Sequence, residues 1–264
     1  MLKASIVGYP SRTRRASSAL ATRGIFLFAG RLNSASLVTA MLQDALFSQG
    51  EGDAWFQRNH QTYRPEQDPM LHALISQNIH PREVLEIGAS DGARLAIIGD
   101  RYQAKATAVE PSQEAVAEGR RSFPEIQFFV STARSLPLPD ESYDCVIIHS
   151  VFHWIDRRSL LGSIAEIDRV LQPNGHLLIG DFCPYSPKKV RYHHRPDVKI
   201  YTYKQDYSAI FLATAGYVLL GQQMIGHASR EPSPEICEYD RFSISVLKKL
   251  SGGIYAEMQP DVGA

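Results

Sequence analysis

The sequence has few cysteines and no long apolar run. Its three cysteines, Cys145, Cys183 and Cys237, lie far apart and lack the paired spacing of a zinc site or a disulfide framework, so a reducing compartment fits best. A helix that spans a membrane needs about 18 consecutive apolar residues, and the longest candidate stretch here is residues 25–29. These absences predict a soluble protein without a membrane-embedded segment.

Acidic residues are missing from the start of the sequence. None precedes Asp44, whereas six Lys and Arg residues do. Of the 28 basic residues, 22 therefore belong to the remainder, which holds all 28 acidic ones. Broad nucleic-acid binding depends on neutralising phosphates, so a mildly acidic body argues against a nucleic-acid partner.

Residues 1–40 are rich in Ser, Arg and Ala and show no clear apolar periodicity. This composition is typical of an organelle transit peptide, although a disordered extension or a misassigned start, with Met41 as the first residue, is favoured. We expect a cytoplasmic protein, or a protein of the mitochondrial matrix if the segment is a transit peptide.

Short apolar runs alternate with helical patterns through the middle of the chain. The runs typical of strands are residues 84–87, 106–109, 126–130, 143–148 and 176–182. Helical patterns are found at residues 65–79, 93–102, 112–123 and 160–171, and the second predicts a buried helix. Ser112 is the candidate N-cap of the third, and the fourth has one apolar stripe, Leu160, Leu161, Ile164, Ile167, Val170 and Leu171. The alternation predicts an α/β fold with a Rossmann-like, doubly wound, mainly parallel sheet and helices on both faces. Two later strands, at 217–225 and 242–247, predict an antiparallel C-terminal hairpin that completes seven strands.

A glycine-spaced turn follows the first strand, in the segment VLEIGASDG at residues 84–92. Gly88 and Gly92 allow a ligand to approach the backbone closely, and the next helix directs its free N–H groups to the same place. Glu110 ends the second strand 18 residues after Gly92, where a carboxylate can accept both hydrogens of a ribose diol. The two features together predict a nucleoside pocket.

The acidic residue Glu86 distinguishes between two classes of nucleoside cofactor. A dinucleotide site has three glycines in G-x-G-x-x-G and a pyrophosphate on the helix N-terminus, whereas this turn has Gly88, Ser90 and Gly92. A carboxylate at Glu86 is unfavourable beside a pyrophosphate and favourable beside a sulfonium and an ammonium. The sequence therefore favours a sulfonium nucleoside. An NAD-dependent Rossmann oxidoreductase and a catalytically inactive cofactor-binding accessory protein remain the alternatives.

From about residue 55 to residue 247, the sequence resembles the class I S-adenosylmethionine-dependent methyltransferases, of the type 11 kind. Four segments carry the resemblance in the right order, namely VLEIGASDG, AVEPS, SLPLPDESYDCVIIHSVFHWI and RVLQPNGHLLIGDF. A weaker match, GDAWFQRN, is similar to the entry region of bacterial methyltransferases of sugar and polysaccharide pathways. The resemblance implies a helical lid at residues 41–80 and a methyltransferase domain at 81–264, with an acceptor-binding insertion at about 184–210.

The resemblance also implies that the cofactor is S-adenosyl-L-methionine. The residues implied to hold its methionine end are Glu86, Gly88, Ala89, Ser90 and Gly92, with Arg58, Asn59 and Tyr63 as candidates for its carboxylate. The residues implied to lie at the ribose and adenine are Glu110, Pro111, Thr132 and Ala133. Two positions depart from the family pattern: Ser90 replaces the middle glycine, and Thr132 stands where an acid often contacts the adenine amino group.

Methyl transfer to a hydroxyl requires alignment of the acceptor and a base that removes its proton. His149 ends the fourth strand and is the favoured base, His153 follows it in HSVFHW, and a structural role stays open for both. The candidates for acceptor binding are Asp181, Tyr192, His193 and His194. Asp181 could equally cap a turn, and the three later residues could form a solvated loop. No metal site is expected, because the adjacent histidines lack further ligands.

These features predict a methyltransferase that acts on a small molecule. We expect a small polar acceptor, methylated at an oxygen of a sugar or related metabolite. The chain is expected to act as a monomer or homodimer, without a nucleic-acid or membrane partner.

Overall fold

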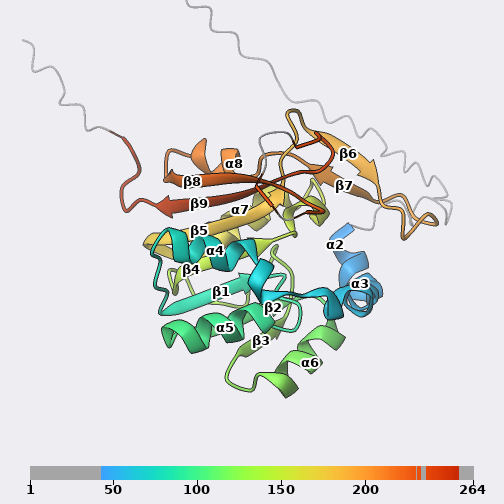
Figure 1. Ribbon diagram of the computed structural model, residues 1–264, viewed down its shortest axis with the longest axis horizontal. Coiled ribbons are helices and arrows are strands. Elements are labelled where there is room, and N and C mark those ends of the chain that lie inside the picture. The colour runs from blue at the N-terminus through green and yellow to red at the C-terminus, as the bar shows by residue number, and fades with distance from the viewer. Residues whose placement is uncertain (1–42, 230, 233–235, 256–264) are drawn as a thin grey trace, which may run out of the picture. The chain divides into compact units, whose positions relative to one another are not determined.

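The computed structural model describes residues 43–229, 231–232 and 236–255 (Figure 1). The predicted extension at residues 1–40 lies outside them. None of the helices in the described part of the chain combines the length and the apolarity needed to cross a bilayer.

The central sheet has seven strands in the order β3-β2-β1-β4-β5-β9-β8, and Figure 1 shows β8 at one edge and β3 at the other. Strands β1 to β5 are parallel, and β9 is antiparallel to both β5 and β8. The bounds are β1 (Glu83–Ile87), β2 (Lys105–Glu110), β3 (Gln127–Val130), β4 (Tyr143–His149), β5 (Leu171–Phe182), β8 (Tyr217–Gly226) and β9 (Arg241–Lys249). The predicted seven-stranded, mainly parallel sheet is confirmed.

The order of the strands reverses at β1, which lies between β2 and β4. Ile87 is paired with Val109 on one side and with Ile148 on the other, so the three strands end level with one another. The residues that follow these pairs, including Glu110 and His149, consequently lie at the same edge. Such a switch point is where open α/β sheets bind their ligands.

Alternating side chains of the strands build one apolar core on each face of the sheet. On one face, Val84 of β1 packs in a core to which α4 (Pro69–Ser76), α5 (Ala93–Tyr102) and α6 (Gln113–Ser122) contribute. On the other face, Leu85 and Ile87 pack with η5 (Phe152–Trp154), α7 (Leu160–Val170) and α8 (Ser208–Leu212). Because successive side chains of a strand point to opposite faces, Glu86 shares the face of Val84.

Two details of the predicted helices were wrong. The helix expected at residues 65–79 is divided into η4 (Pro65–Gln67) and α4, because Asp68 adopts an extended conformation before Pro69 and caps α4 with its side chain. Leu161 was expected in the apolar stripe of α7, but it is 72% exposed. The buried side of the helix is formed by Leu160, Ile164 and Ile167, and Leu161 lies outside it.

Two further segments lie beyond the carboxyl ends of the strands. The cover segment, residues 43–64, consists of α2 (Gln43–Leu46), η2 (Phe47–Glu51), α3 (Gly52–Asn59) and η3 (His60–Thr62) and the two residues that follow. The insertion hairpin, residues 188–204, consists of antiparallel strands β6 (Lys188–Arg191) and β7 (Tyr201–Lys204). The hairpin gives structure to the insertion that was predicted at about 184–210.

Candidate active site

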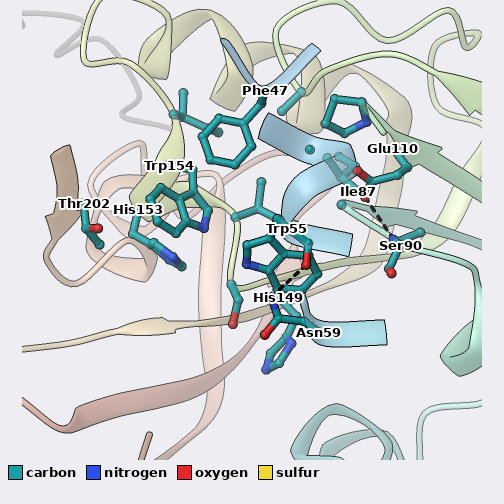
Figure 2. A pocket seen from close by; sticks show the side chains of 18 of the residues that line it. Phe47, Trp55, Asn59, Ile87, Ser90, Glu110, His149, His153, Trp154 and Thr202 are labelled. Carbon is teal, nitrogen blue, oxygen red and sulfur yellow. Dashed lines mark hydrogen bonds between the residues drawn. The ribbon is translucent and has the colours of Figure 1, made fainter. Parts of the chain in front are cut away.

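A cavity of about 590 Å³ lies at the carboxyl ends of β1, β2 and β4, between the cover segment and the insertion hairpin (Figure 2). It brings most of the predicted site residues together: Asn59, Tyr63, Glu86, Gly88, Ala89, Ser90, Glu110, Pro111, Thr132, Ala133, His149, His153, Tyr192, His193 and His194. Of the predicted site residues, all of which are described, Arg58, Gly92 and Asp181 do not line it.

The glycine-spaced turn holds Glu110 at the floor of the cavity. Gly88 has a φ of 73°, and a Cβ atom there would lie 2.2 Å from the side chain of Val151. Ser90 also has a positive φ, 53°, and its N–H donates to one carboxylate oxygen of Glu110 at 2.9 Å, the bond drawn in Figure 2. The N–H of Ser112 donates to the other oxygen at 3.0 Å. Burial raises the pKa of Glu110 to about 7, against the effect of these two hydrogen bonds.

Arg94 lies at the centre of a buried group of charges that also contains Glu86, Asp68 and His149, here called the Arg94 cluster. Arg94 Nε is 2.8 Å from Asp68 Oδ2, and Nη1 donates to Glu86 Oε1. Nη2 is 3.3 Å from Nδ1 of His149. Because Glu86 faces α4 and α5, it meets a side chain from the first turn of α5 and one from the N-cap of α4.

Sequence reasoning missed Arg94 and Asp68. The signal for Arg94 was an arginine within the apolar stretch ARLAII, on a helix that was expected to be buried. A buried arginine must find carboxylate partners, and Glu86 was the acid placed on the same face of the sheet. The signal for Asp68 was weaker, an acid before a proline at the start of a helix.

Two polar atoms of this region have no hydrogen-bond partner among the described residues. They are Oε2 of Glu86 and the hydroxyl oxygen of Tyr63, both buried. One guanidinium faces two carboxylates in the Arg94 cluster. Burial therefore raises the pKa of Glu86 to about 7; Arg94 opposes this shift, and the negative charge of Asp68 adds to it. Burial also raises the pKa of Tyr63, which keeps its hydroxyl protonated. The cavity therefore presents an acceptor, a donor and an excess of negative charge.

His153 forms a buried pair with Asp181. Its Nδ1 is 2.7 Å from Asp181 Oδ1, and its backbone N–H donates to Oδ2 at 3.2 Å. An ionised carboxylate only accepts hydrogen bonds, so Nδ1 carries the proton and Nε2 is left as an acceptor. His153 lines the cavity whereas Asp181 does not. Asp181, predicted to orient the acceptor, orients His153 instead.

His149 has different surroundings. Its Nδ1 faces the guanidinium of Arg94, and its ring packs edge-on against Phe242 at 5.6 Å between centroids. A proton added to this ring would place a second positive charge beside Arg94, although the carboxylate of Asp68 attracts that charge. The geometry therefore ties His149 to the Arg94 cluster.

Arg58 and Tyr192 join the cover segment to the insertion hairpin. Arg58 Nη2 donates to Glu51 Oε1 at 2.7 Å and to the hydroxyl of Tyr192 at 2.8 Å, and that hydroxyl donates to the same Glu51 oxygen at 2.8 Å. Arg58 was predicted to bind the methionine carboxylate and Tyr192 to bind the acceptor. In the structure, both side chains form hydrogen bonds that connect the two segments. We call these three residues the Glu51 tie.

His193 and His194 follow Tyr192, and both are exposed side chains that line the cavity. Their rings lie 3.9 Å apart between centroids. In the part of the chain that the structure describes, no group of three or more His, Cys, Asp or Glu residues could hold a metal ion.

Comparisons with known proteins find methyltransferases. Residues 85–179 match the family model described as a methyltransferase domain. An uncharacterized methyltransferase of Mycobacterium tuberculosis is 30% identical over 141 residues, which are 53% of this chain and 54% of that protein. The O-methyltransferase cnsE of Penicillium expansum is 32% identical over 121 residues, 41% of this chain and 43% of that protein. The chain spans about half the length of the curated relatives it matches.

A solved structure extends the likeness to the fold. The Burkholderia thailandensis 1,6-didemethyltoxoflavin-N1-methyltransferase, with bound 1,6-didemethyltoxoflavin and S-adenosylhomocysteine, aligns with a TM-score of 0.60 and 17% identity over 84% of this chain and 93% of that chain. At this identity the comparison speaks for the fold alone. Residues 85–179 thus match a methyltransferase domain, and the chain shares its fold with a methyltransferase solved with bound S-adenosylhomocysteine.

Proposed function

We propose that the protein transfers a methyl group from S-adenosyl-L-methionine to an oxygen of a small polar metabolite. The observation that carries this proposal is the incompletely compensated carboxyl group of Glu86 at the end of β1. Glu86 retains a buried oxygen without a partner among the described residues, in a cluster where one arginine serves two acids. A cationic ligand satisfies such a site, and the pyrophosphate of NAD does not.

The residues present fit the predicted cofactor. Oε2 of Glu86 is available to accept from the ammonium group, and the hydroxyl of Tyr63 to donate to the carboxylate. Glu110, held by two backbone N–H groups, keeps lone pairs for the ribose diol. Thr132 and Ala133 remain the predicted adenine contacts, and both line the cavity. S-adenosylmethionine supplies a methyl group bonded to a positively charged sulfur, which makes that carbon open to direct displacement.

His153 is the base that the geometry supports best. Asp181 fixes its tautomer and orientation, so that Nε2 can take the proton of an acceptor hydroxyl, and stabilises the imidazolium that forms. Sequence reasoning favoured His149, because that position departs from the family pattern. His149, in contrast, directs Nδ1 at the guanidinium of Arg94 and belongs to the Arg94 cluster, whereas His153 has a carboxylate on Nδ1. The proposed methylation of oxygen agrees with the similarity to an O-methyltransferase, while a sugar as the acceptor stays a prediction.

Calorimetric titration with S-adenosylhomocysteine tests the cofactor assignment. We expect binding to the wild-type protein, and a loss of about 1–3 kcal/mol of binding free energy in Glu110→Ala, because charge-assisted hydrogen bonds to the ribose are removed. Glu114→Ala is the matched control, since Glu114 is an exposed acid at the start of α6 that does not line the cavity. Binding of NADH without S-adenosylhomocysteine binding would support the oxidoreductase alternative instead.

The affinity for S-adenosylhomocysteine should also depend on pH. The ribose diol needs the ionised carboxylate, and the pKa of Glu110 lies at about 7. Below pH 7 the ligand must therefore displace a proton, so the affinity falls by about tenfold per pH unit for each carboxylate that ionises on binding, and above pH 7 it levels off. Glu110→Gln should remove one proton from this dependence. Titrations in buffers with different enthalpies of ionisation count the protons released, and an unchanged count in Glu110→Gln would contradict the assignment.

A further inference from the structure

Beyond His153, the wall of the cavity is organised around the ring of Phe182 at the end of β5. The ring centroid of Phe182 lies 5.1 Å from that of His153 and 4.6 Å from that of His227. The ammonium nitrogen of Lys204, at the end of β7, is 3.6 Å from the Phe182 centroid. All four side chains line the cavity. Lys204 is thus separated from the proposed base by one aromatic ring.

Lys204 is a half-buried cation without an ion pair to any described residue. Its contacts are the Phe182 ring and the carbonyl oxygen of Tyr239, which is 3.5 Å away. Lysine is strongly hydrated and is half-buried at a cost unless a partner replaces water. Desolvation lowers the pKa of Lys204, although Asp181 and Asp240 oppose this shift. The charge of this side chain is therefore poorly compensated.

The two acids that act on Lys204 are already engaged. Asp181 Oδ1 accepts from the ring of His153 and from the N–H of Phe182 at 2.7 Å each. Asp240 Oδ1 accepts from the N–H of Ala228 at 3.0 Å. Neither lines the cavity. An anion that enters the cavity can consequently reach the ammonium group without displacing a carboxylate.

The acids that do line the cavity belong to other parts of it. Asp68 and Glu86 pair with Arg94, and Glu110 and Asp91 belong to the strand ends and the turn at the cofactor side. Asp44, from the cover segment, accepts from the N–H of Asp156 at 2.8 Å and from the hydroxyl of Ser159. The acceptor side, formed by η5, the end of β5, the insertion hairpin and His227, is lined by aromatic rings, by His153, His193, His194 and His227, and by the cations Lys204 and Arg191. Lys204 and Arg191 thus meet no acid that lines this side, whereas the cofactor side holds four acids together with Arg64, Arg94 and Arg134.

From this division we propose that Lys204 binds an anionic group of the methyl acceptor, a carboxylate or a phosphate, and that the acceptor is a hydroxylated anion. The proposal rests on the proposed function. When the anionic group of the acceptor is bound at Lys204, its hydroxyl is placed at Nε2 of His153, on the other side of the Phe182 ring. The acceptor oxygen forms a bond to the methyl carbon as the bond between that carbon and sulfur breaks. The hydroxyl proton passes to Nε2, and S-adenosylhomocysteine and the methyl ether leave.

Ligand binding to the full chain saturated with S-adenosylhomocysteine tests this proposal without knowledge of the natural acceptor. The probes are matched pairs, 4-hydroxybenzoate with 4-hydroxybenzamide and phenyl phosphate with phenol, measured by saturation-transfer NMR and calorimetry. We expect the anion of at least one pair to bind about tenfold or more tightly than its neutral partner, with a preference that weakens at high salt. The pair that shows the larger preference distinguishes a carboxylate from a phosphate acceptor.

Variants assign the preference to one side chain. Lys204→Met should abolish it, and Lys204→Arg should retain part of it. Lys189→Met is the matched control, because Lys189 is an exposed lysine of the same hairpin that also lies over an aromatic ring, Tyr201, and does not line the cavity. Equal binding of charged and neutral partners, or an unchanged preference in Lys204→Met, would overturn the proposal. A failure of S-adenosylhomocysteine to bind would instead overturn the proposed function, and the same titrations without it still report on Lys204.

Discussion

Methyl transfer is expected to slow by about 10²- to 10⁴-fold when His153 is replaced by glutamine, because the acceptor hydroxyl then loses its general base. The side chain of His153 is held by Asp181 through Nδ1, so the group that remains for the acceptor is Nε2. Glutamine fills a similar volume and can still bond to Asp181. The rate is measured as release of S-adenosylhomocysteine with the acceptor that a screen of hydroxylated anions identifies, and calorimetry should show unchanged affinity for S-adenosylhomocysteine.

Two companion variants make the assignment of the base specific. Asp181→Asn should also slow transfer, since an amide can donate to Nδ1 and so favour the wrong tautomer of His153. Its pH profile should change together with the rate, which a purely structural role would not produce. His149→Gln should retain more than about a tenth of the activity, because a general base alone accounts for larger effects. A large loss in His149→Gln combined with normal turnover in His153→Gln would restore the interpretation drawn from the sequence.

Arg94→Met is expected to destabilise the protein by about 3–5 kcal/mol, the usual effect of removing one partner of a buried ion pair. Glu86 and Asp68 would be left without their guanidinium in a buried site, where only 1% of the surface of Glu86 and 2% of that of Asp68 is exposed. Urea denaturation monitored by circular dichroism measures the free energy of unfolding. Arg101→Met, a change on the exposed end of the same helix, should cost less than about 1 kcal/mol.

The effect of Arg94→Met should itself depend on pH. Without the guanidinium, burial raises the pKa of Glu86 further, and the pKa of Asp68, which Arg94 helps to lower, rises as well. Each acid then binds a proton more readily in the folded than in the unfolded protein. Stability of the variant is then greatest at low pH and is lost as the pH rises through these raised values. A second substitution, Glu86→Gln, should recover part of the loss at neutral pH. An equal loss at pH 5 and pH 8, or a loss below about 1 kcal/mol, would show that the Arg94 cluster is not an ion-pair network in solution.

Much of the fold could be predicted because the strands and helices carry strong local patterns. The strand VLEIG ends in a glycine-spaced turn, and the Ser112 side chain caps α6 as its position suggested, accepting from the N–H of Ala115 at 3.1 Å. The carboxyl ends of parallel strands converge by topology alone, so Glu86, Glu110 and His149 could be placed in one site from the sequence. The predicted residues of the glycine turn required only this local information.

The pairing of side chains from distant segments could not be predicted. Arg58 has two partners, Glu51 and Tyr192, and the second is 134 residues away in the sequence. Likewise, no local pattern says that Asp181 will meet His153 rather than the acceptor, because that contact depends on how η5 folds back over β5. For the two histidines, the neighbours decide which can accept a proton, and the neighbours come from other elements.

The Glu51 tie gives the cavity a shared boundary. It connects the cover segment, which contributes Tyr63 to the cofactor side, with the insertion hairpin, which contributes Lys204 to the acceptor side. A ligand that orders one of these segments lowers the entropic cost of ordering the other. The affinities for donor and acceptor are therefore expected to be linked, each ligand strengthening the binding of the other by the same factor. By the same reciprocity, release of either product lowers the affinity of the protein for the product that remains.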